Sequence, residues 1–288
     1  MSHEVDLIDP GTKRSRRALI NVIQGLQEHR EALTVLGGHA VIEMTWHLKT
    51  LPIPDTTLDG DLGVTPQLLA ETPLLVEKMI ELGYEAARTE RPGVWSPTEE
   101  ADLPPHDRTS VDLIAPRAVA APGITRAIRA ARVPPHGKHS VSATEGTELS
   151  LINRTLMTLR SFDDGPSAEA YVAGPTALLC AKAYKLHDRM DPNELGRNRE
   201  RLRPKDFADL YRLLHAVHAV EAADIFESGA ADPSVGQAVK LGRTYLLELL
   251  QTPEEIAQTV AETWVAPELG DEIAEFVHDW ATDFRLGD

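Results

Sequence analysis

The clearest alternation of apolar and polar positions in the chain lies within residues 57–64. Leu58 and Leu62 fall on one face of this segment, whereas Asp59 and Asp61 fall on the other. A period of two residues is typical of a strand with one buried face. The segment is therefore predicted to be a strand that carries two acids on its open side.

Shorter patterns predict the other elements of the N-terminal half. Apolar residues at a spacing of three or four indicate helices, and short apolar runs indicate strands. Helices are expected over 12–31, with Thr12 as the N-cap, over 39–48 and within 66–82, and strands near 32–36, 84–88 and 110–115. Residues 91–107 are expected to form a loop, and residues 116–138 a partly helical segment or a flap.

From Gly174 onward the pattern is helical almost to the last residue, and prolines divide it into segments. Helices are expected over 175–190, 204–218, 220–228, 233–250, 253–262 and 268–284. Strands mixed with helices, followed by helices alone, are typical of an α/β (α+β) domain followed by a helical domain. The boundary is expected in the turn Asp163–Pro166, which gives an α/β domain at 1–165 and a helical domain at 166–288.

The composition narrows the class of protein. The chain has 288 residues, of which 42% are hydrophobic and 26% charged, as in a globular protein of one large or two moderate domains. Cys180 is the only cysteine, which excludes an internal disulfide framework and a cysteine-rich zinc site. No apolar run approaches the roughly 18 residues of a membrane helix, and the N-terminus is polar, so we expect a cytoplasmic protein without a membrane partner.

Charge is distributed unevenly along the chain. The 29 Lys and Arg residues against 45 Asp and Glu residues give a formal net charge of −16, which disfavours general binding to duplex DNA. Residues 219–288 hold 15 acidic and three basic residues, residues 113–144 hold five basic residues and no acid, and residues 182–205 hold eight basic residues and four acids. Basic segments in an acidic protein indicate a cleft that receives an anion, or simply solvated faces.

Asp59 and Asp61 are candidates for a metal site. Residues i and i+2 of a strand project from the same face about 7 Å apart, so their carboxylates can converge on a hard divalent cation. Magnesium takes few protein carboxylates and leaves positions open for water and phosphate oxygens. Alternatively, the two acids only face solvent at a strand edge.

A glycine turn and a third acid extend this candidate site. Gly37 and Gly38 let the backbone approach a ligand closely, and a helix that begins near His39 would present free N–H groups to an anion. Asp112 lies on a second predicted strand. If the two strands are neighbours, Asp112 would be a third metal ligand or the base that deprotonates an attacking hydroxyl. Alternatively, Asp112 is a helix cap or a surface acid.

The predicted helix 175–190 carries a basic stripe formed by Lys182, Lys185 and Arg189. If this helix packs by its opposite, small-residue face, the stripe points outward, where lysines suit a triphosphate. Asp206 could pair with Lys182 and hold it in place, or it is an ordinary acid in the first turn of a helix.

The order and spacing of these motifs resemble those of the nucleotidyltransferase superfamily of the DNA-polymerase-β-like kind, and more narrowly those of the AbiEii/MenA-type nucleotidyltransferase toxins. The resemblance covers about residues 32–215. The matching segments are Val35–Ala40, Thr57–Leu62, Val111–Ile114, Gly174–Arg189 and Lys205–Leu210. His39 stands where the family commonly has a small residue.

The resemblance implies a fold, a reaction and a set of site residues. The fold would be a small mixed sheet with helices, followed by a helical C-terminal domain, and the reaction would be magnesium-dependent transfer of a nucleoside monophosphate from an NTP to an acceptor. The resemblance implies that the strand acids bind magnesium and form the catalytic site with a helix lysine and a later acid: Asp59, Asp61, Asp112, Lys182 and Asp206. It implies that the turn and the helix hold the NTP phosphates: Gly37, Gly38, His39, Lys182 and Lys185.

Three functions are compatible with these motifs. The first is the toxin of a toxin–antitoxin pair, with a tRNA as acceptor and a cognate antitoxin as partner. The second is an enzyme that modifies a small hydroxyl compound, as antibiotic nucleotidyltransferases do. The third is an inactive nucleotidyltransferase fold that serves as a binding module, against which the intact Asp59, Asp61 and Lys182 argue. Arg126, Arg129 and Arg132 are candidates for gripping a polyanionic acceptor, or they line an exposed helix face.

Overall fold

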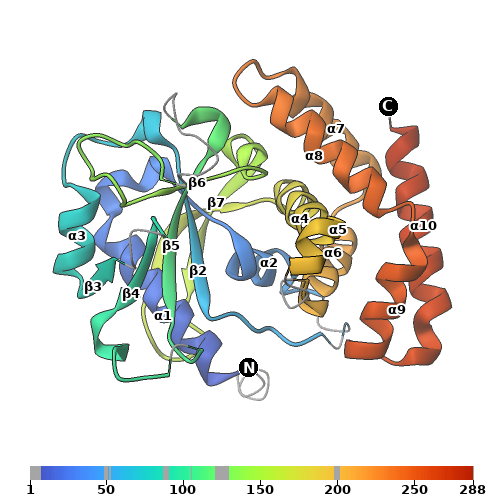
Figure 1. Ribbon diagram of the computed structural model, residues 1–288, viewed down its shortest axis with the longest axis horizontal. Coiled ribbons are helices and arrows are strands. Elements are labelled where there is room, and N and C mark those ends of the chain that lie inside the picture. Colours follow the sequence, from blue (N-terminus) through green and yellow to red (C-terminus); the bar gives the residue numbers. More distant parts are fainter. Residues whose placement is uncertain are drawn as a thin grey trace. The chain divides into compact units, whose positions relative to one another are not determined.

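The computed structural model describes residues 8–48, 51, 53–86, 91–104, 106–120, 130–197 and 202–287. The chain divides into a unit built on a mixed sheet and a unit built of helices (Figure 1). The sheet unit comprises Met1–Ala40, Pro54–Thr144 and Arg154–Ala173, and the helical unit comprises Val41–Ile53, Glu145–Asn153 and Gly174–Asp288. The chain therefore contributes two short segments to the helical unit before Gly174, and all residues from Gly174 onward belong to that unit.

The sheet of the first unit has eight strands among the described residues. The strands are β1 (Leu33–Val35), β2 (Asp59–Val64), β3 (Tyr84–Ala86), β4 (Val94–Pro97), β5 (Ser110–Pro116), β6 (Ser142–Thr144), β7 (Arg154–Arg160) and β8 (Ser167–Ala173). Their order is β3-β4-β5-β2-β1-β8-β7, and β6 pairs with β5. The pairs β2–β5, β1–β8 and β5–β6 are parallel and the other pairs are antiparallel, so the sheet is mixed.

The alternating pattern of β2 and β5 divides the centre of the sheet into two faces. Leu62, Val111 and Leu113 are fully buried on one face. Helix α1 (Pro10–Gly25) packs against β2, β5 and β8, and Leu19 of α1 lies next to Gly60 of β2. The opposite face of the same two strands carries the acidic residues, which are exposed or half-buried. The predicted alternation is confirmed from Asp59 to Leu62, but the strand begins at Asp59, Leu58 is exposed rather than buried, and Gly63 is buried like its neighbours.

Two further helices accompany the strands. Helix α2 (Gly37–Thr45) begins directly after β1 at the glycine turn, and α3 (Leu75–Glu81) lies between β2 and β3 in the sequence. The N-cap of α1 is Asp9, whose Oδ1 accepts a hydrogen bond from the Thr12 N–H at 3.0 Å. The prediction that Thr12 caps this helix is therefore wrong, because Pro10 occupies the first turn and Asp9 precedes it.

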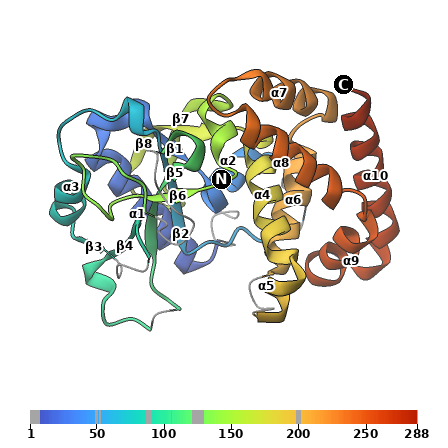
Figure 2. The same ribbon diagram turned by 45° about the horizontal axis from the view of Figure 1, so that its top comes forward.

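The helical unit contains a helix for each of the six segments predicted after Gly174 and, in addition, the short α5, which was not predicted (Figure 2). They are α4 (Pro175–Met190), α5 (Pro192–Arg197), α6 (Pro204–Ala216), α7 (Ala219–Ala231), α8 (Gly236–Leu249), α9 (Pro253–Trp264) and α10 (Gly270–Leu286). Helix α4 packs against α6 and α8, and α10 packs against α7 and α9. Prolines begin α4, α6 and α9, where a missing N–H costs no helical hydrogen bond.

Several expected boundaries differ from the observed ones. The division at 165/166 would separate β8 from the sheet, yet β8 pairs with β1 through Thr34–Tyr171 and Val35–Val172, so the sheet unit extends to Ala173. The predicted loop 91–107 contains β4, which pairs with both β3 and β5. Residues 121–129 of the predicted flap lie outside the described residues. Within the described part of the chain, no helix combines the length and apolar character needed to span a membrane.

Candidate functional site

The pairing of β2 with β5 brings the predicted strand acids onto one face of the sheet. The two strands run parallel, with Asp61 directly opposite Asp112 and Asp59 directly opposite Ser110. Neighbouring strands lie about 4.8 Å apart, and residues in register point to the same face. Asp59, Asp61 and Asp112, which we call the acidic face, therefore lie together although 53 positions of sequence separate the first from the last.

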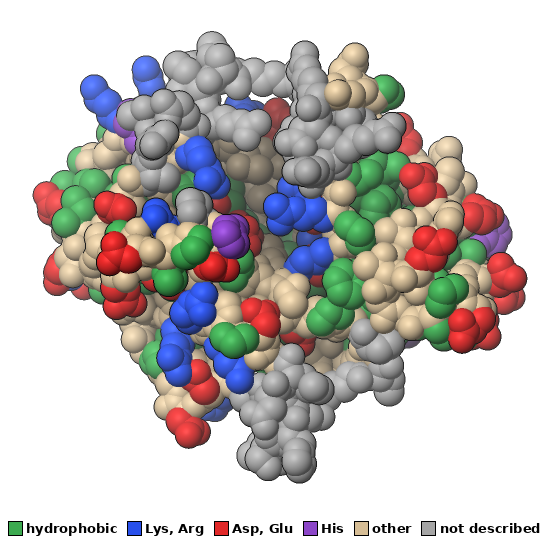
Figure 3. Space-filling view, turned by 60° about the horizontal axis from the view of Figure 1, so that its bottom comes forward, with side chains coloured by type: hydrophobic (Ala, Val, Ile, Leu, Met, Phe, Trp, Pro, Cys, Tyr) green, Lys and Arg blue, Asp and Glu red, His purple; other side chains and the backbone are tan. Residues whose placement is uncertain are grey.

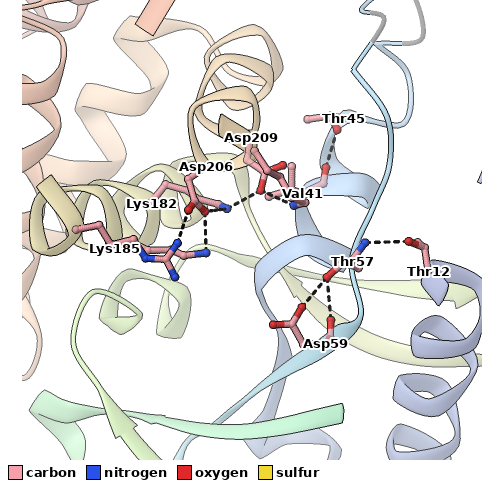
Figure 4. Close-up of polar contacts among 11 residues, drawn as sticks. Thr12, Val41, Thr45, Thr57, Asp59, Lys182, Lys185, Asp206 and Asp209 are labelled. Carbon is pink, nitrogen blue, oxygen red and sulfur yellow. Dashed lines mark hydrogen bonds and ion pairs between the residues drawn. The ribbon is translucent and has the colours of Figure 1, made fainter. Parts of the chain in front are cut away.

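Asp59 stands at the exposed start of β2, and the Thr57 hydroxyl orients its side chain. Its Oδ1 accepts a hydrogen bond from Thr57 Oγ1 at 2.9 Å (Figure 4). The Thr57 N–H donates in turn to Thr12 Oγ1 of α1 at 2.8 Å. This chain of contacts ties the first acid of the acidic face to the first turn of α1.

Asp61 lies against the glycine turn at the start of α2. Gly37 has a φ of +57°, and a Cβ added to it would lie 1.7 Å from Asp61 Oδ2. Only glycine fits both that backbone conformation and that contact. The Asp61 carboxylate thus lies at the N-terminus of α2, where a negative charge is favourable. The glycine turn and Asp61, which were predicted to belong to one site, are in direct contact.

Asp112 is half-buried on β5 and prefers its protonated form more than an ordinary aspartate. Burial and the negative charge of Asp59 raise its pKa to about 6, although a hydrogen bond from Ser110 and the charge of Arg91 act in the opposite direction. The Ser110 hydroxyl donates to Asp112 Oδ1 at 2.9 Å. Because the Asp59 charge is among the causes, the two acids interact electrostatically across the strand pair.

His39 does not contribute its side chain to this site. The ring is fully buried, and its Nε2 shares a 2.8 Å hydrogen bond with Ser15 Oγ of α1, which also donates to the Thr57 carbonyl. His39 thus locks α1, α2 and the segment before β2 together. In the predicted phosphate-binding turn, the space beside Gly37 and Gly38 is occupied by side chains of the protein itself. A Cβ at Gly38 would lie 2.7 Å from Thr57 Oγ1, so this glycine permits the close approach of Thr57.

The comparisons with known proteins do not assign the chain to a family. No protein-family model, curated protein or solved structure matches the chain. The resemblance to nucleotidyltransferases therefore stays a prediction based on the motifs.

In the acidic face, the side-chain groups that could bind a metal ion are the aspartate carboxylates. Among the described residues, no three His, Cys, Asp or Glu side chains are gathered closely enough to form a metal-binding group. The closest match to a magnesium site is the Asp61–Asp112 pair, since magnesium requires only one or two protein carboxylates.

A second group of predicted site residues lies in the helical unit, between α4 and α6. Lys182, Lys185 and Arg189 of α4 and Lys205 of α6 form ion pairs with Asp206 and Asp209 of α6, and we call these six residues the cationic cluster (Figure 4). Lys182 Nζ lies 2.5 Å from Asp209 Oδ2 and 3.4 Å from Asp206 Oδ1. The predicted pairing of Lys182 with Asp206 is confirmed, but Asp209 is the closer partner.

The prediction that Lys182 points outward to a triphosphate is wrong. Its side chain is buried between the two aspartates, which are themselves almost inaccessible. Burial alone would lower the pKa of Lys182, but the charges of Asp209 and Asp206 outweigh it and raise the pKa above its usual value. The outer part of the stripe is formed instead by Lys185, which lies 2.7 Å from Asp206, and by Arg189.

Two contacts of the candidate site residues could have been found from spacing alone. Lys205 and Asp209 stand four apart on α6, the spacing of a helical ion pair, and they are 2.8 Å apart. Ser110 and Asp112 stand two apart on a strand and share a face. Arg126 and Arg129 lie outside the described residues, and Arg132 is exposed.

The acidic residues of the C-terminal segment lie on the surface. Figure 3 shows acidic side chains scattered over the helical unit on the right of the view. The exposed acids of α9 and α10 are Glu254, Glu255, Glu262, Asp271, Glu272, Glu275, Asp279 and Asp283. For these residues, the interpretation as a solvated face is confirmed.

Proposed function

We propose that the chain is a magnesium-dependent nucleotidyltransferase that transfers a nucleoside monophosphate from an NTP to an acceptor. The observation that carries this proposal is the register of β2 and β5. It sets Asp61 beside Asp112, with Asp59 on the same face and the Gly37 turn against Asp61. Acids on two neighbouring strands beside a glycine turn form the arrangement that the resemblance implies for this family.

The donor set of the acidic face suits magnesium. Asp61 and Asp112 would hold the ion, because hard divalent cations prefer carboxylate oxygens, and Asp59 would add negative charge nearby. The raised pKa of Asp112 beside the Asp59 charge favours this assignment, since a bound cation would relieve the repulsion between them. When bound, the ion would neutralise charge on the phosphates and orient the α-phosphate for attack.

The residues around the acids position them for such chemistry. Thr57 fixes Asp59 through a hydroxyl hydrogen bond, and Ser110 does the same for Asp112. The start of α2 offers backbone N–H groups and a positive dipole end to an anion. Phosphoryl transfer requires mainly positioning and electrostatic stabilisation, which pre-oriented carboxylates and backbone groups supply. Asp112 would either bind metal or accept the proton of the attacking hydroxyl.

The nucleotidyltransferase-like fold is part of the same proposal. The mixed sheet, the glycine turn between β1 and α2 and the helices after Gly174 agree with the architecture that the resemblance implies. The acceptor is a separate question. The toxin hypothesis predicts a tRNA acceptor and a cognate antitoxin, whereas a small-molecule enzyme would modify a hydroxyl compound and an inactive fold would modify neither.

The proposal is tested by incubating the full chain with each radiolabelled NTP, magnesium and either total RNA or a panel of aminoglycosides and other hydroxyl compounds. We expect magnesium-dependent label on an acceptor with the wild type and none with Asp59→Ala or Asp61→Ala. Glu85→Gln, which removes an exposed acid of β3 that β4 separates from β5, is the control and should transfer at the wild-type rate.

Label on RNA would support the toxin hypothesis, and label on a small acceptor the second one. Equal activity of the wild type and both aspartate variants would contradict the site. Absence of label from every acceptor, with folded protein and intact NTP, would favour the inactive binding module.

A further inference from the structure

Strand β7 forms a long, regular edge of the sheet. It ends the strand order on one side, and within the described part of the chain it pairs only with β8. All seven residues of β7 stand in register with β8, without a bulge, whereas β3 at the opposite end of the sheet has three residues. An open edge pairs readily with another strand, so proteins protect edges by shortness, bulges, prolines or charges. In β7, charges stand only at the two ends.

The hydrogen bonds of the β7–β8 pair show which backbone groups face the open edge. Ser161 directly follows β7, and its N–H donates to the Pro166 carbonyl at 3.0 Å, in the register of the pair. Residues of an antiparallel pair alternate between bonding to the partner strand and pointing their N–H and C=O away from it. The odd-numbered residues of β7 therefore bond to β8, and the even-numbered residues present their backbone groups to the open edge.

The open edge is centred on Leu156. The outward carbonyl of Arg160 already accepts a hydrogen bond from Arg16 Nε at 2.9 Å. The other outward carbonyls of the strand belong to Arg154, Leu156 and Thr158. Leu156, in the middle of these, is 40% exposed, and Thr158 is exposed as well. A second strand would bury this leucine and gain an apolar cross-strand contact.

The guanidinium group of Arg154 is directed away from the open edge. It donates to Thr34 Oγ1 at 3.0 Å and to the Glu31 carbonyl at 3.1 Å, and it lies 4.1 Å from the centre of the Tyr171 ring. Thr34 belongs to β1 and Tyr171 to β8, so these contacts draw the arginine over the sheet. Arg154 therefore does not shield the backbone of β7 from a partner strand.

An identical strand is complementary to this edge. In an antiparallel pair with its two-fold axis at Leu156, even-numbered residues face even-numbered residues, so the outward N–H and C=O groups of both copies meet. Leu156 then faces its own copy, and Thr158 of one copy faces Arg154 of the other. Arg160 of each copy lies beyond the end of the other β7, so no two arginines are directly opposite. An axis at Met157 would instead set Arg154 against Arg160, which is unfavourable.

We propose that the chain forms a two-fold symmetric dimer in which β7 pairs with β7 of a second copy around Leu156. The two sheets join into one continuous sheet, and the same patch is used twice, as in most soluble dimers. Strands β1 and β8 separate β7 from the acidic face, so the dimer does not depend on the proposed function.

Thiol cross-linking of the full chain tests the position of the axis, since the only cysteine, Cys180, is buried. In Leu156→Cys the Cα atoms of the two thiol-bearing residues would lie about 5.5 Å apart, so a short homobifunctional thiol reagent should link them into a covalent dimer. Thr158→Cys, also exposed, is the matched control. Its copy would lie four residues farther along the partner strand, about 13 Å away, which is beyond the reach of the reagent.

Sedimentation velocity tests the backbone pairing. The wild type should shift from monomer to dimer between about 1 and 200 μM, because small interfaces dissociate in the micromolar range. Thr158→Pro should stay monomeric over this range, since the Thr158 N–H would bond to the second copy and not to β8. Its thermal unfolding should show a folded protein, because proline is tolerated where the N–H points away from the sheet. Thr158→Val keeps the N–H and should dimerise like the wild type.

A wild type that stays monomeric at every concentration would overturn the proposal and leave β7 to a strand of another protein. Equal cross-linking of Leu156→Cys and Thr158→Cys would overturn the axis at Leu156. A dimer that persists in folded Thr158→Pro would place the interface elsewhere. If Thr158→Pro does not fold, the cross-linking of Leu156→Cys against Thr158→Cys still decides.

Discussion

At the scale of single residues, the candidate site depends on contacts that few other side chains would allow. Gly37 combines a left-handed backbone with direct contact to Asp61, and Ser110 holds Asp112 by one hydrogen bond. His39 shows the converse case, because a histidine in a predicted ligand-binding turn packs inward against Ser15. A residue type therefore indicates chemistry only together with the direction of its side chain.

Gly37→Ala should abolish nucleotide transfer. The new Cβ would occupy the position of Asp61 Oδ2 and displace that carboxylate, and the left-handed backbone would cost about 1–2 kcal/mol of stability. Gly83→Ala is the matched control, since Gly83 has a φ of +83° but its Cβ would have no neighbour closer than 3.8 Å. Thermal unfolding and transfer assays should show both variants destabilised and only Gly37→Ala inactive. Wild-type transfer by Gly37→Ala would contradict the contact.

Ser110→Ala should raise the pKa of Asp112 above about 6. The Ser110 hydrogen bond favours the charged carboxylate, so its loss leaves burial and the Asp59 charge less opposed. Carboxyl carbon resonances followed by NMR during a pH titration measure this shift. Ser142→Ala, whose hydroxyl donates to the Leu113 carbonyl instead, should leave the pKa of Asp112 in place. A lower or unchanged pKa in Ser110→Ala would disprove the assigned cause.

At the scale of elements, the buried ion pairs between α4 and α6 hold two helices in a fixed rotation. Asp209 accepts from Lys182 and Lys205, while Asp206 is shared by Lys182, Lys185 and Arg189. Burial alone would raise the pKa of Asp209, but the charges of Lys182 and Lys205 outweigh it and hold the pKa below its usual value. The ionised form of Asp209 therefore stabilises the folded state.

Asp209→Asn should destabilise the protein by about 3 kcal/mol at neutral pH. The buried, charged Lys182 would then lack the negative charge of its closer partner and keep only Asp206 as a carboxylate partner. The native pKa of Asp209 is depressed, so its contribution is present above the unfolded pKa of about 4 and is lost as the pH falls below it. Denaturant unfolding between pH 7 and 3 should show a smaller loss of stability on acidification in Asp209→Asn than in the wild type. Asp224→Asn, on the exposed side of α7, is the control. Identical pH dependence of Asp209→Asn and wild type would contradict the role of this carboxylate.

Elements with a strong local pattern were predictable, and elements fixed by distant partners were not. The alternation of β2 and the prolines that begin α4, α6 and α9 locate these elements from the sequence alone. Strand β7 lacks such a signal, since it is an edge strand with mostly exposed positions, and β8 alternates but buries mainly small residues such as Ala168 and Ala170. Their pairing with the sheet through β1 depends on residues more than a hundred positions away.

At the scale of the whole molecule, the candidate site was predictable from the sequence only where its residues are close together in the chain. The sequence predicts that Asp59 and Asp61 share a face, because i and i+2 on a strand always do. It does not predict that Asp61 pairs with Asp112, because the parallel register of β2 and β5 is a non-local property of the sheet. The sequence also predicts that the Lys182 side chain points outward, whereas the packing of α4 on α6 buries this lysine.

The most direct measurement of the central claim is calorimetric titration of the protein with manganese, a substitute for magnesium. The acidic face should bind one ion, and the double variant Asp61→Asn/Asp112→Asn should bind it at least about tenfold more weakly, since both paired carboxylates are removed. Glu85→Gln should bind like the wild type. If the double variant binds manganese as tightly as the wild type does, the acids of β2 and β5 do not form the metal site.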